Sequence, residues 1–140
     1  MKIWITLFSL LFFNAAQAEG YGSYKAEVIR VIDGDSIEVR AHIWPGLTQT
    51  VKLRLAGVNT PEKRGKGIST CEKKAGQDAT TFTQRWLKGA GMVTISEIRL
   101  GKYAGRVLGR VSKDGEYLGE ALIKAGLAKP YSGGKRLPWC

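Results

Sequence analysis

Histidine and cysteine are scarce in this chain. Of its 140 residues, one is histidine and two are cysteine. Structural zinc sites usually take four cysteine or histidine ligands, so these counts argue against a zinc centre. Internal repeats and low-complexity linkers are also missing. We therefore predict one domain of ordinary size.

Acidic residues are also few. The chain has 12 aspartate and glutamate residues against 22 lysine and arginine residues, a formal net charge of +10. This surplus favours a polyanionic partner such as nucleic acid, anionic lipid or polysaccharide. Many exported proteins are basic only for solubility, so the charge alone does not decide for nucleic acid.

No apolar run is long enough to span a bilayer, which takes about twenty residues. The apolar run Ile3–Phe13 follows the cation Lys2 and precedes the small residues of Ala16-Gln17-Ala18. This order is typical of a signal peptide at 1–18. We expect cleavage after Ala18 and export to a periplasm or the medium. An uncleaved membrane anchor is the alternative.

The mature domain is then expected at 19–140, with 19–23 as a flexible lead-in. In an oxidising compartment the two cysteines can pair. Cys71 precedes an expected helix and Cys140 is the last residue, so a bond between them would tie down the tail. Spacing alone does not establish this bond, because the two Cα atoms must come within about 7 Å.

Hydrophobic periodicity divides the mature domain into strands and helices. Two alternating runs flank the turn sequence Asp33-Gly34-Asp35, which indicates a hairpin. In the main helix, Ala75, Ala79, Phe82 and Trp86 recur at helical spacing and predict one apolar stripe. The expected strands lie at 25–31, 36–41, 50–55, 92–98 and 106–111, and the expected helices at 72–88 and 118–125.

This order of elements predicts an α+β fold. Three consecutive antiparallel strands suggest a meander that can curl into a small barrel. Five strands with a helix between the third and the fourth follow the order of an OB-fold, which commonly binds oligonucleotides.

An arginine and a glutamate stand near each other at the end of the third strand. Alternation points Leu53 and Leu55 to the core and leaves Arg54 on the other face. After a break at Thr60-Pro61, the chain presents Glu62. A guanidinium can bind two phosphate oxygens, and a carboxylate can accept a proton from an attacking water. This pair suits hydrolysis of a phosphodiester.

Two further motifs extend this hypothesis. Asp33-Gly34-Asp35 puts two carboxylates on a turn, where they can offer hard oxygen ligands to calcium or simply cap the turn. Gly105-Arg106 supplies a second guanidinium that can stabilise the charge of a transition state.

These motifs, in this order, resemble the staphylococcal nuclease family over about Tyr24 to Tyr131. The helical segment 72–83 and the closing segment 120–129 carry the same resemblance. It implies a five-stranded OB-fold barrel with two or so packed helices. It also implies a calcium-dependent nuclease that hydrolyses phosphodiester bonds of DNA and RNA, and we expect a monomer.

The resemblance also implies a role for each motif residue. Glu62 would be the general base, with Arg54 and Arg106 stabilising the transition state. The calcium ligands would be Asp35, Asn59 and Thr60.

The chain departs from the family pattern at Asn59, where the family usually has aspartate. Calcium affinity depends on the number of charged ligands, so we expect a weaker calcium site or the use of another divalent ion. The alternative is a non-catalytic OB-fold protein that binds nucleic acid or another polyanion.

Five residues are candidates for contact with the nucleic acid. Lys63, Arg64 and Lys66 form a basic loop after Glu62 that can guide a phosphate backbone, or simply be solvated. Tyr103 and Tyr131 can contact bases or phosphates, although tyrosines near a barrel often only pack.

Overall fold

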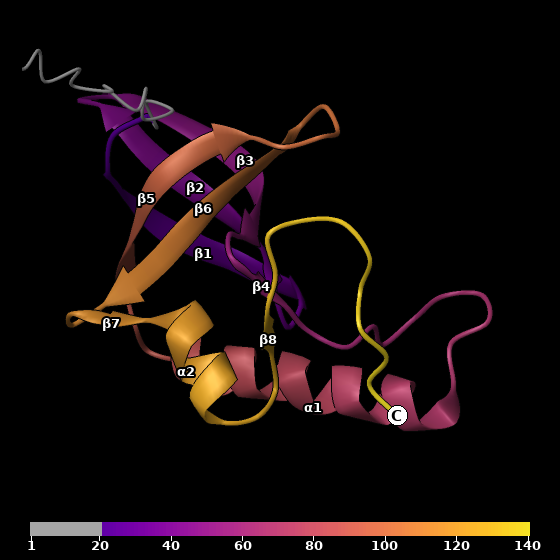
Figure 1. The fold of residues 1–140 in the computed structure, drawn as a ribbon. Coiled ribbons are helices and arrows are strands. Elements are labelled where there is room, and N and C mark those ends of the chain that lie inside the picture. The colour runs from indigo at the N-terminus through magenta and orange to yellow at the C-terminus, as the bar shows by residue number, and fades with distance from the viewer. Residues whose placement is uncertain (1–20) are drawn as a thin grey trace, which may run out of the picture.

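The computed structural model describes residues 21–140, so the expected signal peptide at 1–18 lies outside the described residues. Five long strands form the main sheet, three two-residue strands extend it or pair nearby, and two helices pack below (Figure 1). The strands are β1 (Tyr24–Asp33), β2 (Ser36–Trp44), β3 (Leu47–Leu55), β4 (Val58–Asn59), β5 (Met92–Leu100), β6 (Arg106–Lys113), β7 (Glu116–Tyr117) and β8 (Lys129–Pro130). The helices are α1 (Thr70–Leu87) and α2 (Leu118–Lys124).

The sheet closes on itself. Its antiparallel order is β3-β2-β1-β5-β6, and β3 also pairs with β6 in parallel. Each long strand contributes buried inward residues to the barrel, which are Ala26, Ile37, Val39, Leu53, Leu55, Val93, Ile95 and Val111. The predicted α+β fold, a five-stranded OB-fold barrel with two packed helices, is confirmed.

The expected elements are right in type and approximate in extent. The hairpin of β2 and β3 continues up to the turn at Pro45-Gly46, beyond the predicted ends at Ala41 and Thr50. The three short strands β4, β7 and β8 were not predicted. Each has only two residues, too few for alternation to show.

Helix α1 begins at a capped end and lies against one end of the barrel. Ser69 accepts the Glu72 backbone N–H at 3.1 Å, which satisfies one free donor of the first turn. The predicted apolar stripe packs against the core, where Ala79 is buried and Phe82 and Trp86 are half-buried. The buried face consists of small and polar residues with one leucine, namely Gly76, Ala79, Thr80, Thr83 and Leu87.

The C-terminal tail returns to the start of α1. Strand β8 pairs with β4, and the chain then passes along the barrel and ends beside the first turns of α1 (Figure 1). There a disulfide joins Cys140 to Cys71, with their Cα atoms 6.3 Å apart. At the other terminus, Tyr21 of the expected lead-in donates its backbone N–H to Ile98 O at 3.0 Å. Neither helix of the described chain has the length and apolar character needed to cross a membrane.

The fold predicts that Thr83 anchors the first hairpin turn to α1. Its buried Oγ1 donates to Gly34 O at 2.7 Å. Thr83→Val removes that donor from a dry contact, so we expect the free energy of unfolding to fall by about 1–3 kcal/mol. Urea denaturation measures this loss. The control is Thr81→Val on the same helix, because the Thr81 side chain forms no hydrogen bond within residues 21–140. An equal loss of stability in Thr81→Val would contradict the anchoring role of Thr83.

Candidate active site

The parallel seam between β3 and β6 brings two arginines to one face of the sheet. Lys52 is paired with Arg106, and Arg54 is paired with Leu108. Paired residues point to the same side, and residues two apart along a strand share a face. Arg54 and Arg106 therefore both lie outside the barrel interior. They line one pocket of about 440 Å³.

Arg54 is held by two side chains from other elements. Its Nη2 donates to Asn59 Oδ1 at 3.0 Å and lies 3.4 Å from Asp35 Oδ2. The Arg54 and Asp35 side chains are only 11% and 6% exposed, so their attraction is poorly screened. Tyr131 places its ring centroid 6.0 Å from the guanidinium carbon. These contacts fix one edge of the guanidinium, while the residue still lines the pocket.

Arg106 has an unused donor. Across residues 21–140, its Nε is the only buried side-chain nitrogen or oxygen that lacks a hydrogen-bond partner. Its guanidinium carbon lies 5.3 Å from the centroid of the exposed Tyr103 ring. A buried donor without a partner costs about 1–3 kcal/mol. An anionic oxygen that reached this nitrogen would remove that cost, which requires the Arg106 side chain to shift because the nitrogen itself is buried.

Asp35 is the carboxylate of the first turn that faces Arg54. Its Oδ2 accepts the Thr60 backbone N–H at 3.1 Å, and its Oδ1 accepts the Ser36 hydroxyl at 3.1 Å. Asp33 instead pairs with Lys63 at 3.6 Å. The two aspartates of the motif therefore have different surroundings, and only Asp35 belongs to the arginine site.

The oxygens of Asp35 and Asn59 both face Arg54 Nη2, so they converge on one place. Carboxylate and amide oxygens are hard ligands of the kind that calcium takes. Among the described residues, no three histidine, cysteine, aspartate or glutamate side chains form a metal-binding group. These oxygens have the chemistry of ligands for a hard divalent cation, but only one is a carboxylate and both contact Arg54 Nη2 in the described structure.

Glu62 is positioned by α1. Its backbone N–H donates to Glu72 Oε1 at 3.3 Å. Beneath it, a Cβ on Gly76 would lie 2.5 Å from Lys63 N and 2.6 Å from Glu62 C, so the loop backbone lies directly on the helix. The Glu62 carboxylate forms an ion pair with Arg136 from the tail.

Comparison with known proteins identifies the chain. Residues 52–136, more than half of the protein, match the family model described as staphylococcal nuclease homologue. The chain belongs to the staphylococcal nuclease family. This confirms the predicted resemblance, and the matched segment contains Arg54, Asn59, Thr60, Glu62 and Arg106, whereas Asp35 precedes it.

Curated relatives agree with this family. An uncharacterized endonuclease of Escherichia coli is 30% identical over 105 residues, which are 74% of this chain and 59% of the relative. A protein of the same description from Escherichia coli O157:H7 shows the same identity and coverage. The chain thus spans about 59% of the length of these relatives.

The predicted nucleic-acid contacts separate into two groups in this family member. Tyr103 and Tyr131 line the pocket of the two arginines. Lys63 and Arg64 line a neighbouring hollow together with Glu62, where Lys63 is engaged by Asp33. Lys66 is exposed and lines neither. The tyrosines therefore lie beside the candidate phosphate site, and of the basic loop only Lys63 and Arg64 line the hollow that includes Glu62.

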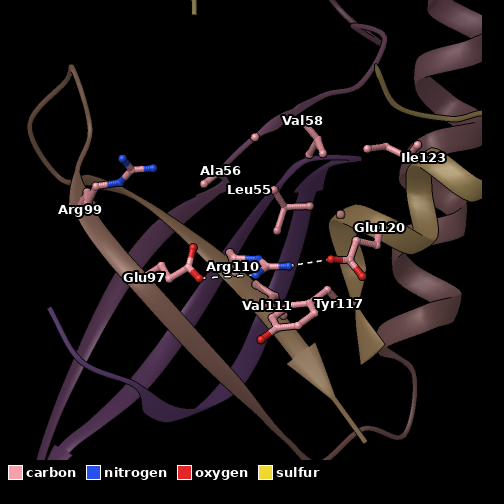
Figure 2. A pocket seen from close by; sticks show the side chains of 12 residues that line it. Leu55, Ala56, Val58, Glu97, Arg99, Arg110, Val111, Tyr117, Glu120 and Ile123 are labelled. Atoms are coloured by element: carbon pink, nitrogen blue, oxygen red, sulfur yellow. Dashed lines mark hydrogen bonds and ion pairs between the residues drawn. The ribbon is translucent and has the colours of Figure 1, made fainter. Parts of the chain in front are cut away.

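A second pocket, of about 320 Å³, shares the wall Leu55–Val58 and Arg99 with the first. Figure 2 shows Arg110 of this pocket between Glu97 and Glu120, at 3.4 and 2.7 Å. The Arg110 guanidinium carbon also lies 3.6 Å from the Tyr117 ring centroid. The carboxylates satisfy the arginine and repel anions, so the first pocket is the better phosphate site.

Sequence reasoning missed two residues of the site. Gly76 carried a usable signal, because a glycine inside a helix is unfavourable and often marks a close backbone approach. Arg136 carried no such signal. Its proximity to Glu62 depends on the path of the tail, which has no periodic pattern.

The close approach at Gly76 predicts a loss on adding one methyl group. Alanine is normally favoured over glycine in a helix by about 1 kcal/mol. In Gly76→Ala the new Cβ would instead meet the backbone of Glu62 and Lys63, so we expect about 1–3 kcal/mol lower stability. Urea denaturation of Gly76→Ala beside the exposed control Gln77→Ala measures this. A stabilised Gly76→Ala would contradict the contact.

Proposed function

We propose that the protein is an exported, calcium-dependent nuclease that hydrolyses phosphodiester bonds of DNA and RNA. The observation that carries this proposal is the pocket that Arg54 and Arg106 both line, and in which, among residues 21–140, the buried Nε of Arg106 has no hydrogen-bond partner. Membership of the staphylococcal nuclease family and the relatives named endonuclease support the same reaction.

Each site residue has a task in this proposal. Arg54 and Arg106 bind the oxygens of the scissile phosphate and stabilise the negative charge that develops during attack. Glu62 accepts the proton of the attacking water. Tyr103 and Tyr131 flank the arginines and contact the bound nucleotide. The basic loop of Lys63, Arg64 and Lys66 attracts the backbone near Glu62.

Asp35, Asn59 and the backbone carbonyl of Thr60 would hold the divalent ion. When bound, the ion supplies positive charge to the phosphate. The chain's own contribution is to keep the oxygens of Asp35 and Asn59 together, which Arg54 and the Thr60 backbone N–H do in the described structure.

Export is supported by two independent features. The pattern at 1–18 is typical of a signal peptide cleaved after Ala18. The Cys71–Cys140 disulfide suits the oxidising environment of a periplasm or of the medium.

A second candidate is a non-catalytic protein that binds nucleic acid through the same pocket. Asn59 favours it, because a neutral amide stands where the family usually has a second carboxylate. Both candidates predict DNA binding that weakens with salt. Only the nuclease predicts products that appear with calcium and disappear with a chelator.

The decisive prediction concerns Glu62. Removing the proton acceptor in Glu62→Gln leaves the pocket's arginines in place, so we expect cleavage of single-stranded DNA to fall about 10²–10⁴-fold while binding changes little. Product formation in calcium and in chelator measures cleavage, and filter binding measures the affinity for single-stranded DNA. Glu116→Gln, at an exposed carboxylate in β7, is the matched control. If the unaltered protein binds the DNA but leaves it intact, the result would support the non-catalytic binding protein instead.

A further prediction concerns Asn59. Asn59→Asp adds a second carboxylate beside Asp35, so we expect calcium to bind roughly tenfold more tightly, since ligand charge sets affinity. Isothermal titration with calcium measures this without substrate. Gln77→Glu adds the same charge on the exposed face of α1 and should change nothing. Unchanged calcium affinity in Asn59→Asp would remove this residue from the ligand set.

A further inference from the structure

We propose that Arg136 is a positioning residue of the active site, and that the Cys71–Cys140 disulfide holds it against Glu62. This inference rests on the nuclease function proposed above and adds a tail residue and a covalent tether to it. Neither the ion pair nor the disulfide is part of the barrel strands: Arg136 and Cys140 follow the last long strand, β6, and Cys71 lies in α1.

The contact between Arg136 and Glu62 joins the tail to the candidate base. Arg136 Nη1 pairs with Glu62 Oε1. Arg136 also lines the pocket that contains Arg54 and Arg106. It therefore stands between the phosphate-binding arginines and the carboxylate that would accept the proton.

The charge of Arg136 is secure. Partial burial lowers its pKa, but the interactions with Glu62 and Tyr131 together outweigh burial and raise the pKa above its ordinary value. A guanidinium has five donors, so it can keep one edge on Glu62 and still present others to the pocket. Such an ion pair restricts the Glu62 carboxylate to one direction.

Besides the ion pair, a few contacts near its two ends hold this part of the tail. Tyr131 donates its backbone N–H to Gly57 O and its hydroxyl to Gly134 O, each at 2.9 Å. Lys129 Nζ donates to Pro138 O at 3.0 Å and lies 4.5 Å from the Trp139 ring centroid. Between them, residues 132–137 are exposed and form no helix or strand. Exposed segments with few contacts open at low free-energy cost. The Arg136–Glu62 contact therefore depends on the contacts that hold the tail on each side of Arg136.

The disulfide is a covalent anchor on the C-terminal side of Arg136. It joins the last residue to the first turn of α1, the helix on which the Glu62 loop rests at Gly76. Both residues of the Arg136–Glu62 pair are therefore connected to α1: the Glu62 loop packs on Gly76, and the tail is joined to Cys71 by the disulfide. Figure 1 shows the tail passing beside the barrel and ending there.

The test compares steady-state cleavage by the full protein and its Arg136→Ala variant. Loss of orientation at a reacting group can cost about 100-fold. We expect kcat to fall about this much with little change in KM, and Arg136→Lys to restore part of it by keeping the charge. Lys135→Ala, an exposed neighbour in the same tail, is the control and should behave as the parent.

The tether is tested by reduction with dithiothreitol and by the double variant Cys71→Ser, Cys140→Ser. We expect a similar fall in kcat, faster hydrogen exchange at tail amides, and no further loss when Arg136→Ala is added, because both changes break one contact. Released tail amides with an unchanged kcat would overturn the tether, and an unchanged or raised kcat in Arg136→Ala would overturn the positioning role. If the parent protein cleaves no DNA, the proposed function fails first, which separates the two failures.

Discussion

The parallel pairing of β3 with β6 is the constraint on which the rest of the structure depends. It closes the sheet, so neither strand is left with an open edge beside the other. The same register buries Leu53 and Leu55 and puts Arg54 and Arg106 outside on one face. A slip by one residue would exchange these faces, so core packing and the position of the arginines are fixed together.

Helix α1 positions the segments that carry two carboxylates of the candidate site. Gly34 and Gly76 each leave no room for a Cβ, since one would lie 2.8 Å from Ala79 Cβ and the other 2.5 Å from Lys63 N. The hairpin turn and the Glu62 loop therefore both lie on this helix. Two carboxylates from distant segments, Asp35 and Glu62, are positioned by one rigid element.

Each carboxylate of the candidate site forms an ion pair with a neighbouring arginine. The buried Asp35 is paired with Arg54, and Glu62 is paired with Arg136. Each carboxylate therefore has a cation close to it, while the buried Nε of Arg106 has no hydrogen-bond partner among residues 21–140. The neighbouring pocket has the opposite arrangement, in which Glu97 and Glu120 surround Arg110. The lining of the first pocket therefore has cations and no carboxylate, whereas the lining of the second has charges of both signs.

Sequence by itself determined the five long strands, α1, the fold class and the family, because alternation and motif order are local properties. It also placed Arg54 on the outer face of β3 through the same alternation. Which face of α1 is fully buried depends on the tertiary contacts: Gly76, Thr80 and Thr83 are buried because the turn and loop backbones lie against them, while Phe82 and Trp86 pack against the core with part of their surface exposed.

The pairs that complete the site were likewise decided only in three dimensions. Lys63 turns to Asp33, and Arg136 reaches Glu62 across 74 positions of sequence. Such contacts arise when barrel closure and the disulfide bring distant segments together. No periodicity or spacing within either segment records where its partner will lie.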